Sequence, residues 1–363
     1  MYQALLTRRY LFSKVMPLLA AVAVLLCTAM VLIIWSVMGG FLNMLVSTGR
    51  TMTGDVVVQW PFVGFAHYED LIARLEKDPL VAAAAPAIET LGTVSLPDGR
   101  NSHVLVRGVN GERYAQVTKY ADILWWRPLE QAMEKDARGD DPRLGGLDNS
   151  DWGAMYDHGL SLMRPDPKTG ELKPAAVPGI EVTGFNAREP EGYYTPRVVN
   201  RRTPEGKLEL IDVFMPRDGS IVINLPTLDS KGRLVDTVSK IFPVANEFQS
   251  GVFEMDDKVV LVHLGALQDM LRMNKARRIL EPGETAQEPI ETDADGQRLV
   301  QDPARVTHVL VKGNGPMATA REAEVLKARV QSIYAGFAAD HPGTVPDEYA
   351  IRILTWRDQN AMM

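Results

Sequence analysis

Residues 16–37, with the sequence MPLLAAVAVLLCTAMVLIIWSV, decide the architecture of this chain, because no residue between Lys14 and Arg50 is charged. An α-helix rises about 1.5 Å per residue, so this stretch is roughly 33 Å long as a helix and long enough to cross the hydrocarbon core of a bilayer, which is about 30 Å thick. We therefore predict one transmembrane helix over residues 15–46.

The charges on either side of this helix predict its orientation. Arg8, Arg9 and Lys14 precede it, and the first acidic residue, Asp55, follows it. Basic residues remain on the cytoplasmic side of a membrane helix, so we expect residues 1–14 in the cytoplasm and the rest of the chain on the far side. Residues 1–14 either form an amphipathic segment that lies on the membrane or only set the topology; both interpretations stay open.

A cleaved signal peptide is the competing interpretation of the apolar segment. Signal peptides have an apolar run of about 7–15 residues that ends in a small-x-small cleavage site, and no such site is present here. A lipoprotein signal is disfavoured because Leu26 precedes Cys27, where a small residue is needed. Cys27 is the one cysteine of the chain, so the exported part is held together by core burial and not by disulfides.

Composition narrows the class of protein. The chain has 363 residues, 46% of them hydrophobic, which is enough to bury the cores of one or two domains. Its net charge is −7 and no basic run occurs beyond the apolar segment. Nucleic-acid binding depends on Lys and Arg that neutralise phosphates, so this class of function is excluded.

The exported part begins with a β-α-β-β pattern. Residues 55–59, DVVVQ, have the β-branched run of a buried strand. Apolar residues of 68–75 recur at helical spacing, and Pro79 follows that helix. Pro97-Asp98-Gly99-Arg100 then predicts a tight turn between two strands, because proline fixes φ and glycine accepts a positive φ. We expect these two strands to form a hairpin.

The later part of the chain closes with a similar pattern. Residues 127–178 are rich in Gly, Pro and charge, which predicts an irregular insertion or linker. Further strands are expected at 207–215, 220–225, 241–246 and 258–264, and a closing β-α-β unit at 307–312, 320–335 and 349–354.

These patterns predict an α+β fold class. The economical arrangement is an α+β domain built from both ends of the exported part, residues 51–126 and 305–355, with residues 179–304 as an inserted β-rich domain. Both ends of such a domain would face the membrane.

Motifs for catalysis or for metal ions are missing from the sequence. It contains no GxSxG, HExxH or CxxC motif, and the six histidines are dispersed without metal-ligand spacing. Asp148–Asp151 (DNSD) resembles part of a calcium loop but lacks its glycine and glutamate in register. We therefore expect no cofactor, no metal site and no enzyme activity in this chain.

Three stretches of the chain carry a family resemblance. They are RRYLFSK (8–14) leading to SVMGGF (36–41), KIFPVANEFQSGVFEMDD (240–257) and TWRDQN (355–360). In this order and spacing they resemble LolC and LolE, the permease subunits of the lipoprotein-releasing ABC transporter in the wider FtsX-like and MacB-type family. Residues 127–178 have no counterpart in that pattern, and Gly39 stands where an asparagine is common.

The resemblance implies a plan and a set of site residues. It implies a periplasmic porter-like domain with an inserted lobe, and residues 356–363 as the approach to a second membrane helix that lies beyond this sequence. It places the cargo entrance at Met38, Gly39, Gly40 and Phe41. It places contacts with partners at Phe248, Phe253, Trp356 and Asn360.

The resemblance also implies a function. We expect a permease in the inner membrane that works with a cytoplasmic ABC ATPase and a second permease subunit. The pair would release a lipid-anchored protein, with a periplasmic carrier as a further partner, by mechanotransmission. Efflux or control of a cell-wall hydrolase is the alternative within the family. A single-pass sensor or scaffold with a partner-binding ectodomain is the alternative from another class.

Overall fold

The computed structural model describes residues 15–49, 52–128, 144, 146–190, 192–203, 205–228, 234–279, 290–292, 298–315 and 319–360. The chain divides into two compact units, Met1–Thr48 and Gly49–Met363. The cytoplasmic segment predicted over residues 1–14 lies outside the described residues.

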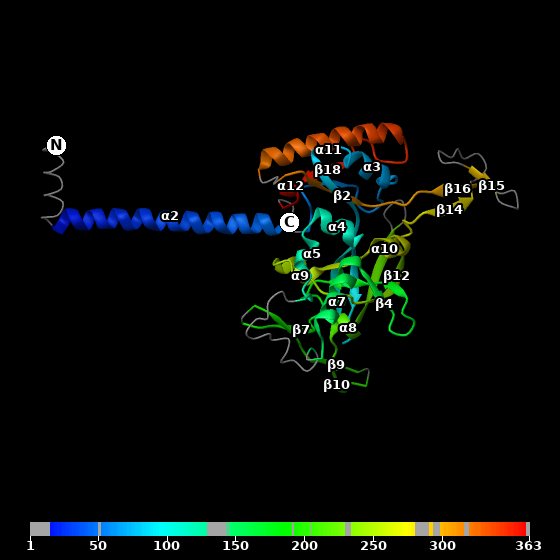
Figure 1. Cartoon of the computed structure of the whole chain (residues 1–363), viewed down its shortest axis with the longest axis horizontal. Coiled ribbons are helices and arrows are strands. Elements are labelled where there is room, and N and C mark those ends of the chain that lie inside the picture. Colours follow the sequence, from blue (N-terminus) through cyan, green and yellow to red (C-terminus); the bar gives the residue numbers. More distant parts are fainter. Residues whose placement is uncertain are drawn as a thin grey trace. The chain divides into compact units, whose positions relative to one another are not determined.

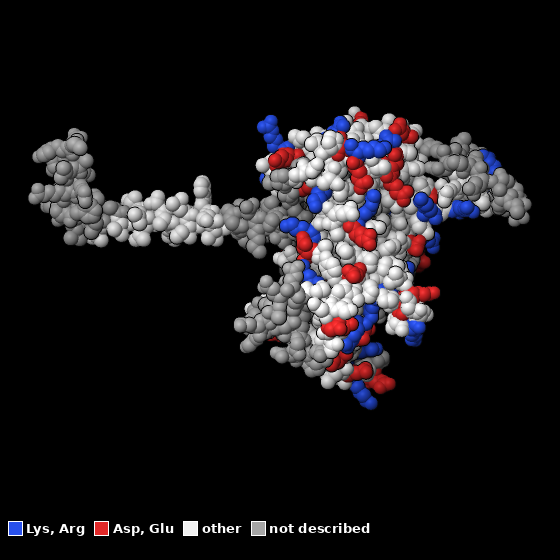
Figure 2. All heavy atoms as spheres, in the orientation of Figure 1, with Lys and Arg blue, Asp and Glu red and all other residues white. Residues whose placement is uncertain are grey.

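The smaller unit contains one described helix, α2 (Val15–Gly49). Its apolar side chains face outward along the described part; Trp35 is 79% exposed, and Leu25 and Met30 are also exposed. Figure 2 shows this part of α2 without Lys, Arg, Asp or Glu. Among the described residues, no helix is both long enough and apolar enough to cross a membrane.

The larger unit is built on a nine-stranded sheet (Figure 1). Its main path runs in the order β18-β1-β17-β2-β3-β13-β6, while β11 pairs with both β2 and β12. The strands are β1 (Val56–Gln59), β2 (Val81–Ser95), β3 (Asn101–Val109), β6 (Ala176–Pro178), β11 (Ser220–Leu228), β12 (Leu234–Pro243), β13 (Val259–His263), β17 (His308–Gly313) and β18 (Arg352–Thr355).

Helices and small sheets surround this large sheet (Figure 1). The helices are α3 (Tyr68–Leu75), α4 (Gly111–Val117), α5 (Tyr120–Ile123), α7 (Asn149–Ser161), α8 (Met215–Asp218), α9 (Phe253–Lys258), α10 (Leu264–Leu271), α11 (Ala320–Asp340) and α12 (Trp356–Asn360). The small sheets pair β4 (Met163–Pro165) with β5 (Leu172–Pro174), β7 (Asn186–Arg188) with β8 (Tyr194–Pro196), β9 (Val199–Arg202) with β10 (Leu208–Ile211), and β16 (Arg298–Asp302) with both β14 (Ala276–Ile279) and β15 (Ile290–Thr292).

Several predicted elements are confirmed. The strand at 55–59 is β1, and the helix at 68–75 is α3. The predicted turn closes the β2–β3 hairpin, where the amide of Leu96 donates to the carbonyl of Arg100 at 2.9 Å and Gly99 has φ +88°. The closing β-α-β unit is β17, α11 and β18. The helix α11 extends to Asp340, beyond the predicted end.

The sheet carries one core on each face, because alternate residues of a strand point to opposite sides. Val56 and Val58 belong to one core and Val57 to the other. The first core also contains apolar side chains of α3, α10 and α11, and the second contains Tyr114 and Val117 of α4. A third, smaller cluster is aromatic and contains Trp126, Trp152 and Phe214.

Two predictions about the middle of the chain are wrong. The sheet crosses the predicted borders of the inserted domain, since β11, β12 and β13 belong to the same sheet as β1, β17 and β18. Residues 127–178, predicted to be irregular, contain α7 and β4, β5 and β6.

The DNSD sequence begins α7 as a capping box. The carboxylate of Asp148 accepts from the amides of Ser150 (2.8 Å) and Asp151 (3.0 Å), and the amide of Asp148 donates to the carboxylate of Asp151 at 3.0 Å. Residues typical of loops therefore serve here as a helix start.

Candidate functional site

The first and last described elements of the larger unit meet at one place, which we call the root and define as residues 52–56 and 355–358. Strand β1 pairs antiparallel with β18, and Val56 lies opposite Thr355. The amide of Trp356 donates to the carbonyl of Asp55 at 3.0 Å. Strand β1 also pairs with β17 on its other side, so both chain segments of the root enter the sheet as neighbours.

Met52 is fixed at the start of the root by two donors. Its side chain is fully buried, and its carbonyl accepts from Arg107 Nη1 at 2.8 Å and from the hydroxyl of Tyr114 at 2.6 Å. Arg107 Nη1 also donates to the Tyr114 hydroxyl at 2.8 Å. Burial raises the pKa of Tyr114, so its hydroxyl remains a donor at neutral pH.

The Arg107 guanidinium also pairs with an acid on the neighbouring strand. Arg107 Nη2 lies 2.6 Å from Glu89 Oε1, and these two residues are cross-strand partners in β3 and β2. Burial alone would raise the pKa of Glu89, but the charge of Arg107 and its hydrogen bond to the carboxylate outweigh burial and lower it. The pair, in which Arg107 is buried and Glu89 is partly exposed, is therefore ionised at neutral pH.

Strand β17 reaches the same carboxylate through His308. His308 Nε2 lies 3.7 Å from Glu89 Oε2. The hydroxyl of Thr307 accepts from the amide of Glu89 at 2.8 Å and lies 2.7 Å from His308 Nδ1. Burial lowers the pKa of His308, so the ring is neutral at neutral pH.

Asp55 and Asp358 complete the root. The amide of Gly313 donates to the Asp55 carboxylate at 3.0 Å, and the amide of Asp55 donates to the carbonyl of Val311 at 2.9 Å. The Asp358 carboxylate accepts from the amide of Thr355 at 2.9 Å and from Lys327 Nζ at 3.0 Å, and these contacts lower its pKa. Hydrogen bonds from β17 and α11 therefore fix both segments.

A second buried polar cluster lies around Glu247. Its carboxyl accepts from Trp126 Nε1 (2.8 Å), Asn186 Nδ2 (2.9 Å) and the hydroxyl of Thr183 (3.2 Å). Burial raises the pKa of Glu247 to about 7, although these three donors act in the opposite direction. The neighbouring Asn246 binds the carbonyls of Trp126 (2.7 Å) and Met155 (3.0 Å). Residues 246 and 247, within the family-like stretch 240–257, thus connect several segments of the chain through buried hydrogen bonds.

The predicted partner-contact residues fall in different environments. Phe248 and Trp356 are core residues, 0% and 1% exposed, so neither side chain presents a surface to a partner. Phe253 begins α9 and is 65% exposed, as a contact residue requires. Asn360 ends α12, and its side chain lies outside the described residues.

The predicted cargo-entrance residues lie within one helix. Met38, Gly39, Gly40 and Phe41 belong to α2, and their side chains lie outside the described residues. The backbone of these residues is therefore helical, and their role as a cargo entrance stays a prediction.

Arg107, Glu89 and Tyr114 were not among the site residues predicted from the sequence. A signal was present, because Arg107 is a charged residue within the apolar strand sequence VLVRGV (104–109). A charge in a buried strand is costly without a partner of opposite charge, so the sequence indicates that Arg107 forms a buried ion pair.

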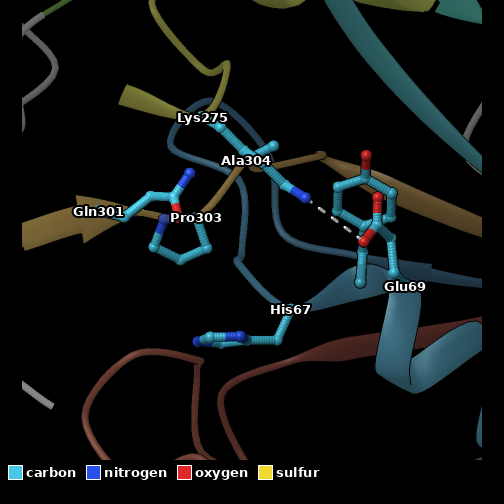
Figure 3. Close-up of a pocket in the computed structure, with 7 residues that line it drawn as sticks. His67, Glu69, Lys275, Gln301, Pro303 and Ala304 are labelled. Atoms are coloured by element: carbon cyan, nitrogen blue, oxygen red, sulfur yellow. Dashed lines mark ion pairs between the residues drawn. The ribbon is translucent and has the colours of Figure 1, made fainter. Parts of the chain in front are cut away.

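A pocket of about 190 Å³ opens on the larger unit (Figure 3). Lys275 Nζ and Glu69 Oε2 lie 3.8 Å apart at this pocket, and both side chains are largely exposed. His67 has φ +56° and stacks on His341, with ring centroids 4.2 Å apart. The pocket is lined by His67, Tyr68, Glu69, Lys275, Gln301, Pro303 and Ala304.

The described residues contain no group of three or more side chains arranged to hold a metal ion. The buried polar groups of the root instead join chain segments to one another. Two of the hydrogen bonds at the root come from charged donors, Arg107 and Lys327, and such bonds are stronger than those between neutral groups.

Comparisons with known proteins give structural likeness only. No protein-family model and no curated protein matches the chain. The periplasmic region of MacB from Actinobacillus actinomycetemcomitans is similar at 7% identity and a TM-score of 0.36, over 86% of this chain and 94% of that chain.

The extracellular domain of the noncanonic ABC-type transporter YknZ from Gram-positive bacteria is similar at 10% identity and a TM-score of 0.35, over 83% of this chain and 99% of that chain. With TM-scores this low, neither likeness by itself indicates a function.

Proposed function

We propose that the chain is a permease subunit of an ABC transporter, and that its larger unit carries movement from membrane helices to an exported surface. The observation that carries this proposal is the root, where β1 and β18 lie side by side and Trp356 binds Asp55. A domain inserted between two membrane helices needs both of its ends at one place. The apolar, uncharged sequence of residues 16–37 supports a membrane location for α2.

Lipoprotein release is the specific activity we propose, and it rests on the three family-like stretches of the sequence. A separate cytoplasmic ATPase would supply the energy, because the sequence contains no phosphate-binding loop. A second permease subunit would complete the membrane part. In this proposal Met38–Phe41 form the cargo entrance, and the chain performs no covalent chemistry.

A movement of the larger unit can release cargo only if the cargo binds less tightly in one conformation of the transporter than in the other. ATP binding by the partner ATPase would draw the membrane helices together, and this closure would displace the root. Because the root is hydrogen-bonded to β3, β17, α4 and α11, the whole larger unit would move with it.

The test uses the complete protein purified from its native inner membrane together with its ATPase and reconstituted in proteoliposomes. A lipid-anchored protein serves as cargo, and its appearance in the soluble phase is measured with and without ATP. We expect ATP-dependent release that is lost when the ATPase cannot hydrolyse ATP.

Hydrolysis without release of cargo would contradict lipoprotein release and favour the efflux or hydrolase-control alternatives. Absence of any associated ATPase would contradict the permease proposal and favour a single-pass sensor or scaffold.

A further inference from the structure

Arg107 is a buried cation that touches both the root and the sheet. It is 4% exposed and bridges Glu89 Oε1 at 2.6 Å and the carbonyl of Met52 at 2.8 Å. Glu89 lies in β2, Arg107 in β3, and Met52 at the point where the chain enters the larger unit. A single side chain therefore connects two adjacent strands to the first residue of the root.

An apolar residue would be the simpler choice for strand packing at this position. Burying an ion pair removes two charges from water, and the attraction between the charges often does no more than offset that cost. The burial of Arg107 is also incompletely compensated, since its Nε is buried and has no hydrogen-bond partner among the described residues. Packing alone therefore does not account for an arginine here.

A planar guanidinium provides several hydrogen-bond donors, which no apolar side chain has. Its separate nitrogens donate in fixed directions, so that Nη2 binds Glu89 while Nη1 binds Met52 and Tyr114. Tyr114, from α4, donates to the same Met52 carbonyl at 2.6 Å. The position of the Met52 carbonyl is thus set by β3 and α4 together.

The other titratable groups around Arg107 extend this connection to β17. His308 Nε2 faces Glu89 Oε2 at 3.7 Å, and Thr307 joins the amide of Glu89 to the ring of His308. The carboxylate of Glu89 therefore lies between a strand that carries Arg107 and a strand that pairs directly with β1.

We propose that Arg107 is a positioning residue that makes the root and the sheet one mechanical unit. Its guanidinium holds the Met52 carbonyl, so that a displacement of the chain at residue 52 is passed to β2, β3 and β17. Without it, residues 52–55 would absorb the displacement. The transport consequence of this inference rests on the proposed function, whereas the local rigidity does not.

The experiment is amide hydrogen exchange on the full chain. Arg107→Met alone would leave the partly buried carboxylate of Glu89 without its arginine, so the main variant is the uncharged pair Glu89→Gln with Arg107→Met. Tyr114→Phe removes the other donor to Met52. Arg113→Met is the matched control, because Arg113 is half-exposed and only its distant ion pair with Glu76, at 3.7 Å, is lost.

We expect the amides of Asp55, Gly313 and Trp356 to exchange at least about tenfold faster in the double variant, because a hydrogen bond from a charged donor is lost. Tyr114→Phe should give a smaller increase at the same amides, and Arg113→Met none. Amides of α11 and of the β11–β12 pair should be unchanged.

Two outcomes would overturn the proposal. If the three amides exchange at the same rate in the double variant as in the wild type, Arg107 does not hold the root. A uniform increase over the whole larger unit would show that Arg107 only stabilises the fold.

A second readout separates this inference from the proposed function. In proteoliposomes, the amount of cargo released per ATP hydrolysed should fall several-fold in the double variant, and an unchanged ratio would contradict the coupling role. If the wild-type protein releases no cargo, the proposed function fails, while the exchange result still decides the role of Arg107 in the root.

Discussion

The amide of Trp356 donates a 3.0 Å hydrogen bond to the carbonyl of Asp55, which places the start of α12 directly against the start of β1. Trp356 is buried and Asp55 is itself bound by Gly313 and Val311 of β17. Because three segments from distant parts of the sequence meet there, the root is a defined structure and not simply a place where the chain enters and leaves the sheet.

Close packing between α4 and α7 leads to the first prediction. A Cβ atom added at Gly111 would lie 1.9 Å from the carbonyl oxygen of Leu160, so Gly111→Ala must displace backbone. We expect the free energy of unfolding to fall by roughly 1–3 kcal/mol. The measurement is urea unfolding.

Gly153→Ala is the matched control, because the nearest atom to its added Cβ is Pro128 Cγ at 4.0 Å. Gly153 lies within α7, so alanine should stabilise the protein by up to about 1 kcal/mol. Equal effects of the two substitutions would contradict the described contact between Gly111 and Leu160.

The buried Glu247 leads to a prediction about pH. Its pKa is raised from 4.5 to about 7 by burial, so the folded state favours the protonated form. The contribution of this group to stability is therefore complete below about pH 4.5 and declines as the pH rises through about 7. The decline should amount to roughly 3 kcal/mol.

Comparing the wild type with Glu247→Gln isolates this effect from the other carboxyl groups. We expect the glutamine variant to be less stable than the wild type at pH 5, because its amide nitrogen opposes a donor in the cluster around Trp126, Asn186 and Thr183. Its disadvantage should shrink as the pH rises from 5 to 8 in denaturant unfolding. A difference that stays constant with pH would show that Glu247 does not titrate in this range.

Membrane topology can be tested with one engineered thiol. Lys168 is exposed in the turn between β4 and β5, and Cys27 is the only natural cysteine. With Cys27 changed to Ala, Lys168→Cys should react with a membrane-impermeant thiol reagent on intact spheroplasts. Gln3→Cys in the same background is the control and should react only after lysis. The reverse pattern would contradict the proposed orientation.

If residues 38–41 form the cargo entrance, a substitution there should abolish cargo release and leave ATP hydrolysis intact. Gly40→Leu would fill a space that a lipid chain needs, whereas ATP hydrolysis depends on another subunit. In the complete protein we expect loss of cargo release with hydrolysis retained. Phe41→Ala tests the adjacent side chain. Normal release by both variants would show that this part of α2 serves only as an anchor.

Much of the fold could be predicted from local patterns. The valines of β1, the turn at Pro97–Arg100 and the apolar face of α11 each depend on neighbouring residues in the sequence, and all three are confirmed. The two ends of the exported part were also expected to form one domain, because they have a similar pattern of elements, and β1 and β18 do lie in one sheet.

Long-range pairing could not be predicted in the same way. Strand β13 pairs in parallel with β3, and β11 pairs with β2, so the middle of the chain extends the sheet instead of forming a separate domain. Periodicity identifies a strand but not its partner. The ion pair of Arg107 and Glu89 was missed for the same reason, since it joins two strands and the carbonyl of Met52.

A disulfide between β1 and β18 tests whether these two strands move as one body. Gln59 lies opposite Arg352, so Gln59→Cys with Arg352→Cys in a Cys27→Ala background should form a cross-link in native membranes. Gln59→Cys with Ile353→Cys is the control, because adjacent residues of a strand face opposite sides of the sheet and this pair should not cross-link.

We expect the cross-linked complete protein still to release cargo in an ATP-dependent manner, because β1 and β18 move as one body. Failure to form the cross-link would contradict the described register. Release that stops on cross-linking and returns with reductant would show that the two strands must separate, which would contradict the proposal that the root moves with the larger unit as one body.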